Sequence, residues 1–231
     1  MRLLLINPNT SAHITERLAV SARDVLTPQD ELTAVTAADG PAVVQNAQHL
    51  RRAELSALTL AAAHAQGHDA IVLGISLDGA APRLRSRHPG LAVVGMTEAA
   101  LMTACLHSER IGLLTFGASL LPLYRQRVEQ TGLASRVIAY EAPECARAFA
   151  AGTERVDAAV LDPLAAGCER LRRSGAQAVV LAGAVLCGYA APLATRCGLA
   201  TFDGVACAVG QIRILLTLRD SRMQLGLESK C

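Results

Sequence analysis

Short, continuous runs of apolar residues alternate with longer mixed segments along the whole chain. A continuous run is typical of a strand in a parallel sheet that is covered on both faces. The segments between the runs are long enough for helices, and strands that alternate with helices require a parallel sheet with right-handed crossovers. The predicted strands are residues 3–6, 32–37, 70–74, 91–94, 111–114, 137–140, 178–182 and 200–202.

The second half of this pattern repeats the first at a constant offset of 108 residues. Thr115 lies 108 positions after Asn7, and Ser119 lies 108 positions after Ser11. The tripeptide Gly-Leu-Ala at 90–92 recurs at 198–200. Two copies of one unit predict an α/β fold with two similar doubly wound parallel-sheet lobes, related by a pseudo-twofold axis, and an active-site cleft between the lobes.

The predicted connections divide the chain into two lobes, and the C-terminal helix returns to the first lobe. We expect the helix after Glu98 to carry the chain into the second lobe, and the helix after Asp203 to return it to the first. The first lobe then comprises residues 1–98 plus 207–231, and the second comprises residues 99–206.

Composition narrows the class of partner. Hydrophobic residues make up 52% of the 231 positions and charged residues 18%, which is typical of a folded globular chain. A net charge of +2 is too small to favour nucleic acid or an anionic membrane surface. The uncharged stretch 174–195 is interrupted by Gly183, Gly188 and Pro192, so we expect a buried strand, a loop and a helix there rather than a membrane span.

The cysteines and the loop motifs argue against a metal site or a cofactor. Seven cysteines occur without a CxxC pair or any Cys/His zinc spacing. Their odd number, and an apolar run before Asn7 that is too short for a secretory signal, predict the reducing cytoplasm. Neither a dinucleotide fingerprint nor a phosphate-binding loop with its Lys follows any predicted strand, so no nucleotide cofactor is expected.

Four loops are expected to meet at the cleft, because ligands of open parallel sheets bind beyond the carboxyl ends of the strands. They are residues 7–11, 74–79, 115–119 and 182–187, and all are rich in Gly, Asn, Ser or Thr. Backbone amides in such loops suit a carboxylate or another small anion. The candidate substrate-binding residues on these loops are Asn9, Thr10, Gly74, Ile75, Thr115, Phe116, Gly117, Gly183 and Ala184.

Four segments carry a family resemblance when they are taken together and in this order. They are NPNTS at 7–11, GP at 40–41, VGMTEAA at 94–100 and FDGV at 202–205. The chain resembles the hydantoin racemase branch of the aspartate/glutamate racemase superfamily over nearly its whole length. The resemblance implies a homo-oligomeric isomerase that needs no cofactor and acts on a hydantoin, amino-acid-like or small carboxylate substrate. In that family two cysteines, one in each lobe, exchange a proton with opposite faces of the substrate's α-carbon.

This chain departs from the family at both cysteine positions, which fall at Ile75 and Gly183. Neither residue can carry a proton, so we expect the two-thiol mechanism to be absent. Ser76 and Cys187 are the candidate catalytic replacements. Ser76 either donates to a substrate carboxylate, as the similar Gly-x-Ser run of arylmalonate decarboxylases does, or caps the following turn. Cys187 either reaches the cleft or is a small buried apolar residue.

Three acidic residues complete the candidate set. Asp78 is either a proton carrier near the cleft or an exposed turn residue, Glu98 follows a strand, and Asp203 is expected to cap a helix. Three functions therefore stay open: an isomerase with altered acid and base groups, a decarboxylase or other lyase, and a catalytically silent binding relative.

Overall fold

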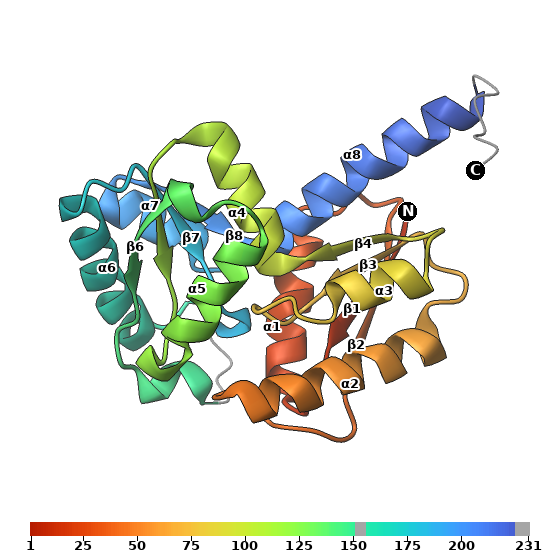
Figure 1. Cartoon of the computed structure of the whole chain (residues 1–231), viewed down its shortest axis with the longest axis horizontal. Helices are drawn as coiled ribbons and strands as arrows, with labels where there is room; N and C mark the ends of the chain where they lie inside the picture. Colours follow the sequence, from red (N-terminus) through yellow and green to blue (C-terminus); the bar gives the residue numbers. More distant parts are fainter. Residues whose placement is uncertain (151–155, 225–231) are drawn as a thin grey trace.

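The computed structural model describes residues 1–150 and 156–224. The chain forms two α/β lobes, each built on a four-stranded parallel sheet, as the sequence predicted (Figure 1). The first sheet has the order β2-β1-β3-β4 and the second has the equivalent order β6-β5-β7-β8. The strands are β1 (Arg2–Asn7), β2 (Glu31–Thr36), β3 (Ala70–Leu73), β4 (Ala92–Gly95), β5 (Ile111–Leu114), β6 (Val137–Glu141), β7 (Ala178–Leu181) and β8 (Ala200–Asp203).

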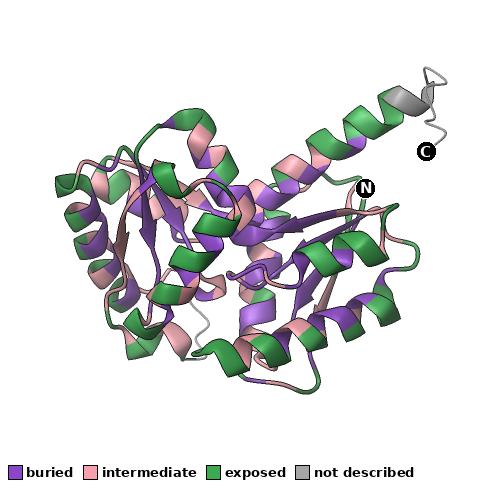
Figure 2. Ribbon diagram, viewed as in Figure 1, coloured by how far each residue is buried: buried purple, intermediate pink, exposed green. Residues whose placement is uncertain are grey.

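Helices cover both faces of each sheet, which explains the continuous apolar runs of the central strands. Every residue of β3, β5 and β7 is buried, whereas the edge strand β6 is only partly covered (Figure 2). The helices are α1 (Ala12–Arg23), α2 (Ala47–His64), α3 (Ala81–Arg87), α4 (Met96–His107), α5 (Leu121–Gln130), α6 (Ala158–Arg173), α7 (Ala190–Cys197) and α8 (Gly204–Gln224), with short 3-10 turns η1 (Ala118–Leu120), η2 (Ala134–Arg136), η3 (Ala146–Phe149) and η4 (Ala184–Leu186).

The offset of 108 residues is visible in the central strand pairs. Leu3 pairs with Ala70 in the first sheet, and Ile111 pairs with Ala178 in the second. The next pairs, Ala70 with Ala92 and Ala178 with Ala200, keep the same offset. The two sheets therefore present their carboxyl ends in the same way.

Two long connecting helices join the lobes. Helix α4 leaves β4 and leads to β5, while α8 leaves β8 and packs against α4, α1 and β4. The uncharged stretch 174–195 contributes β7, η4 and part of α7. Within the described residues no helix is both long and apolar enough to cross a membrane.

Candidate functional site

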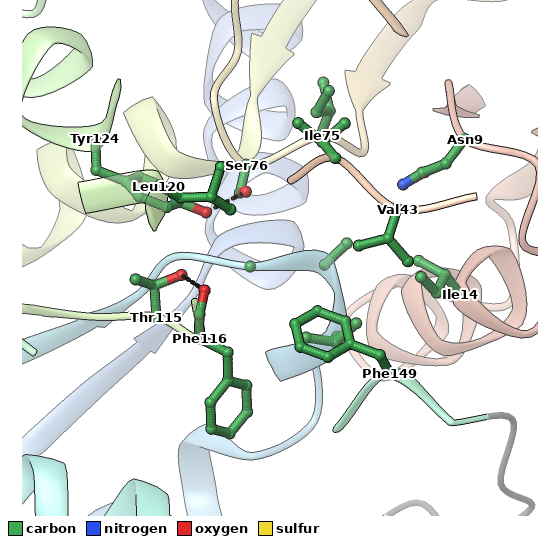
Figure 3. A pocket seen from close by; sticks show the side chains of 14 residues that line it. Asn9, Ile14, Val43, Ile75, Ser76, Thr115, Phe116, Leu120, Tyr124 and Phe149 are labelled. Carbon is green, nitrogen blue, oxygen red and sulfur yellow. Dashed lines mark hydrogen bonds between the residues drawn. The ribbon is translucent and has the colours of Figure 1, made fainter. Parts of the chain in front are cut away.

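A small pocket lies between the lobes, where the loops after β1, β3, β5 and β7 converge (Figure 3). Its volume is about 50 Å³, which is room for about four water molecules. The site is therefore suited to a small molecule. The lining residues are Asn9, Ile14, Val43, Val44, Ile75, Ser76, Thr115, Phe116, Leu120, Tyr124, Phe149, Gly183, Ala184 and Val185.

One wall of the pocket carries a pair of hydroxyl groups from different lobes. Ser76 Oγ lies 2.5 Å from the phenolic oxygen of Tyr124, and the Tyr124 hydroxyl donates to the Ala182 carbonyl at 2.9 Å. Since the tyrosine proton points to the carbonyl, Ser76 donates to Tyr124. A ligand that accepts the Ser76 proton would replace Tyr124 as its partner. The Ser76 side chain therefore bonds to Tyr124 of the other lobe instead of capping its own turn.

Burial keeps Tyr124 in its neutral form. The side chain is 1% exposed, and its burial raises the pKa of the phenol, although hydrogen bonds with Ser76 and Thr115 act in the opposite direction. Among the described residues that line the pocket, Tyr124 is the one with an ionisable side chain. At neutral pH this wall therefore offers hydrogen-bond donors rather than a base.

Asn9 adds an amide without a partner on its oxygen. The side chain is 5% exposed and points into the pocket, and its Oδ1 is buried with no hydrogen-bond partner (Figure 3). Its backbone N–H donates to Asn7 Oδ1 at 3.1 Å, which fixes the loop after β1. Figure 3 shows the amide nitrogen at the end of the side chain that faces the pocket, so Asn9 offers a ligand a hydrogen-bond donor.

The other walls are mainly apolar. Figure 3 shows Ile14, Val43 and Phe149 grouped on the side opposite Ser76 and Tyr124. The position that matches Ser76 in the second copy is Ala184, which also lines the pocket but carries no polar side-chain atom. The remaining hydroxyl of the described lining belongs to Thr115, which donates to the Phe116 carbonyl at 3.3 Å, so the hydroxyl pair itself lies on one wall.

The predicted binding residues divide into two groups. The lining includes Asn9, Ile75, Ser76, Thr115, Phe116, Gly183 and Ala184. It does not include Thr10, Gly74, Gly117 and Cys187.

Backbone roles explain three of the four that do not line the pocket. The Thr10 amide donates to the Pro41 carbonyl at 3.1 Å. Gly74 lies against Leu18 and the Ile6 carbonyl, and an added Cβ would come within 2.8 Å of Leu18. Gly117 has a φ of +84°, which suits the turn that leads into η1.

Cys187 belongs to the hydrophobic core. It is 2% exposed, and burial raises the pKa of its thiol well above the usual value, with the Asp203 carboxylate adding to the shift. A buried neutral thiol that lies off the pocket is a poor proton carrier. None of the described cysteines is among the lining residues.

The expectation that Asp78 is an exposed turn residue is wrong. Its side chain is completely buried, and its carboxylate accepts from the Glu98 amide at 2.7 Å and the Thr97 amide at 3.4 Å at the start of α4. Burial raises the pKa of Asp78 to about 7, although Arg127 lowers it. The sequence pattern around Asp78 is that of a polar turn, and it gives no sign of this tertiary contact.

Asp203 caps a helix, as predicted. Its Oδ1 accepts from the Val205 and Ala206 amides at 2.9 and 3.1 Å, and its Oδ2 accepts from the Gly188 amide at 2.8 Å. The described residues contain no group of three or more His, Cys, Asp and Glu side chains arranged to hold a metal ion.

Several lining residues were not predicted from the sequence. Tyr124 and Leu120 come from α5 and the turn before it, and Val43 and Val44 come from the loop before α2. These positions follow no strand of the sheet directly, so the rule about carboxyl ends of strands does not find them. The sequence offers one signal for Tyr124, which is that tyrosine is rare, with three in the chain.

Comparison with known proteins shows the family of the chain. The Asp/Glu/Hydantoin racemase family matches residues 3–212. A hydantoin racemase of Paenarthrobacter aurescens is 29% identical over 234 residues, covering 96% of this chain and 94% of that protein.

Two solved structures are also similar. The allantoin racemase from Klebsiella pneumoniae has a TM-score of 0.85 and 27% identity, covering 94% of this chain and 88% of that chain. An arylmalonate decarboxylase shares the fold alone, with a TM-score of 0.62 and 15% identity over 93% of this chain and 92% of that chain. With a match that extends from the first strand into the last helix, the chain belongs to the Asp/Glu/hydantoin racemase family.

Proposed function

We propose that this chain is a racemase-family enzyme that binds a small hydantoin-like, amino-acid-like or carboxylate substrate in the inter-lobe pocket. It acts without a cofactor and without a pair of thiols. The observation that carries the proposal is the hydroxyl pair of Ser76 and Tyr124, which lies on the pocket wall beside the loops after β3 and β7. The 75 and 183 positions, where the family cysteines are expected, hold Ile and Gly.

The hydroxyl pair serves as an oxyanion site in this proposal. Removal of a proton next to a carbonyl places negative charge on the carbonyl oxygen, and the Ser76 hydroxyl turns its proton from Tyr124 to that oxygen. Donors fixed in advance in a small, partly apolar pocket stabilise such charge more than water does. Because the described lining has no carboxylate, histidine or thiol, solvent hydroxide removes the proton and becomes water, a solvent water returns a proton to either face of the enolate, and we expect turnover to be slow.

Deuterium exchange tests this function. An enantiopure 5-substituted hydantoin is incubated in deuterated buffer with and without the protein, and exchange at the α-carbon is followed by proton NMR. We expect exchange above the protein-free rate, with Ser76→Ala lowering the protein-dependent part by on the order of 100-fold, the cost of losing one oxyanion donor. Cys187→Ala is the matched control and should leave the rate unchanged. Exchange that is lost in Cys187→Ala but kept in Ser76→Ala would refute the proposal.

A decarboxylase is the second candidate, and the one-sided placement of the hydroxyls favours it. Decarboxylation of a malonate breaks the bond to one carboxylate, releases carbon dioxide and leaves an enolate that takes up a single proton. It therefore needs an oxyanion site but no base on the opposite wall. Release of carbon dioxide from an α-substituted malonate, with one enantiomer of the product in excess, would favour this candidate. Binding of hydantoin or malonate with neither exchange nor release would indicate a silent relative.

A further inference from the structure

Helix α5 of the second lobe presents two side chains, one turn apart, to the loop between β3 and α3 of the first lobe. Tyr124 meets Ser76 at 2.5 Å, and Arg127 Nε lies 3.9 Å from Asp78 Oδ2. Residues three apart on a helix share a face, just as Ser76 and Asp78 share one short loop. The two contacts therefore form a single junction between the lobes.

Asp78 is held firmly on its own side of this junction. Its φ of +49° is uncommon for a residue other than glycine. The carboxylate occupies the space beside Gly95, where a Cβ would come within 2.4 Å of Asp78 Cγ. It also accepts the first amides of α4, an arrangement that favours a negative charge. The loop conformation therefore places this carboxylate between the start of α4 and helix α5.

We propose that Asp78 and Arg127 are positioning residues, an ion pair between the lobes that holds Ser76 against Tyr124 at the pocket wall. The inference rests on the proposed function only where it treats the hydroxyl pair as an oxyanion site. Arg127 is 9% exposed, and its guanidinium faces two carboxylates, with Nε 3.9 Å from Asp78 Oδ2 and Nη2 3.3 Å from Glu98 Oε2. When Asp78 takes up a proton, its attraction to Arg127 is lost and the contact between α5 and the loop loosens.

The ionisable groups around Asp78 come from four elements. Arg127 and Tyr124 face it from α5, and Glu98 faces it from α4. Glu98 Oε2 is shared between Arg127 at 3.3 Å and Arg85 of α3 at 2.9 Å. Glu54 of α2 lies beside Gly79, and its burial raises its pKa while Arg127 lowers it.

Within this set of charges, the pKa of Asp78 lies near neutral pH. Burial raises the pKa of Asp78 to about 7, with Glu98 adding to the rise and Arg127 opposing it. The junction therefore changes its charge near neutral pH.

The second copy of the fold has no such pair. The position that matches Asp78 is Leu186, and the position that matches Arg127 is Ala19. The N-terminus of the equivalent helix α8 is capped by Asp203, which stands where the first copy has Gly95. The carboxylate that caps the helix comes from the loop in one copy and from the helix start in the other. Only the loop-borne carboxylate is placed to bind α5.

The test is a pH titration of Tyr124 by NMR of the full chain labelled with ¹³Cζ-tyrosine. The chain has three tyrosines, so the spectrum is simple, and Tyr124→Phe assigns the signal. From pH 5.5 to 8.5 we expect the Tyr124 signal to shift with a midpoint near 7. We expect the shift to disappear in Asp78→Asn, and its midpoint to rise by about one pH unit or more in Arg127→Met, to the upper end of this range or beyond it, because that change removes the opposite charge. Asp162→Asn, an exposed acid of α6, is the control and should leave the midpoint unchanged.

A Tyr124 signal that does not move over this range, or that moves equally in Asp78→Asn, would overturn the inference. The unsubstituted protein supplies the main readout, so the test holds even if a variant fails to fold. The titration needs no substrate. A protein that shows the midpoint but no hydantoin exchange would therefore support the positioning pair and refute the proposed function, and the two failures are distinguishable.

Discussion

Tyr124→Phe removes one oxygen atom that bonds to two partners, the buried Ala182 carbonyl and the partly buried Ser76 hydroxyl. The hydroxyl donates to the Ala182 carbonyl at 2.9 Å and accepts from Ser76 at 2.5 Å, and the ring is 1% exposed. Phe fills nearly the same volume, so the packing of the core is retained. What changes is that the Ala182 carbonyl loses this donor and Ser76 loses an acceptor.

The expected cost follows from these two contacts. Leaving a buried polar group unsatisfied costs about 1–3 kcal/mol, and the Ser76 hydroxyl recovers part of the loss because it faces the pocket. We expect a decrease of about 2 kcal/mol in the free energy of unfolding, or about 4–8 °C in Tm for a chain of this size. Urea unfolding followed by circular dichroism gives the free energy, and a thermal scan gives the Tm.

Tyr140→Phe is the matched control, because it makes the same chemical change at a half-buried site. The Tyr140 ring lies under the Arg125 guanidinium at 4.1 Å, and its hydroxyl has no hydrogen-bond partner in the described chain. We expect a change of no more than about 0.5 kcal/mol there. A cycle with Ser76→Ala should give a coupling energy of about 0.5–1.5 kcal/mol for the hydroxyl pair. Equal effects at Tyr124 and Tyr140, or a coupling near zero, would refute the description of this wall.

Three further predictions concern the carboxylates at the helix starts. Gly95→Ala should cost about 1–3 kcal/mol, since its Cβ would displace the Asp78 carboxylate, and the cost should shrink in an Asp78→Ala background, measured by urea unfolding. Asp203→Ala should lower Tm by about 2–8 °C, because three backbone amides lose their acceptor, and an unchanged Tm would contradict this. Stability should also fall as pH rises from 5 to 8. The reason is that Asp78 has a pKa of about 7 in the folded protein against the ordinary aspartate value of 3.8, so the folded form holds a proton that the unfolded chain has released, worth at most about 4 kcal/mol. Its contribution is complete below pH 3.8 and is lost as pH passes through 7. Asp78→Asn should remove this slope in urea unfolding, and an identical slope in the variant would contradict the assignment.

The backbone of this protein was predictable because its signals are local or repeated. The buried strands are continuous apolar runs, so β5 was predicted at its observed bounds, Ile111–Leu114. The offset of 108 residues predicted a second sheet with the order of the first. The pocket loops followed from the rule about strand ends, which brought Asn9, Ser76 and Gly183 to the site.

The chemistry of the side chains was harder to predict because it depends on contacts between distant segments. Tyr124 looks like an ordinary helix residue, and only the packing of α5 against the first lobe turns its hydroxyl to Ser76. Asp78 sits in a sequence of turn character, yet α4 and Arg127 enclose it. Cys187 is close to the pocket loop in sequence, but the turn at η4 directs it into the core.

The two copies of the fold have kept their backbones alike while their side chains at the pocket have diverged. Ser76 and Tyr124 correspond to Ala184 and to Glu16, an exposed residue of α1, so the second copy offers no hydroxyl pair to the opposite face of a ligand. A two-thiol reaction that passes a proton between two faces needs a carrier on each wall, and two equivalent copies can supply one carrier each. A pocket with its donors on one wall does not need such symmetry. The asymmetry supports the proposed one-sided enolate chemistry, in which Ser76 is the donor and the Asp78 junction holds its loop in place.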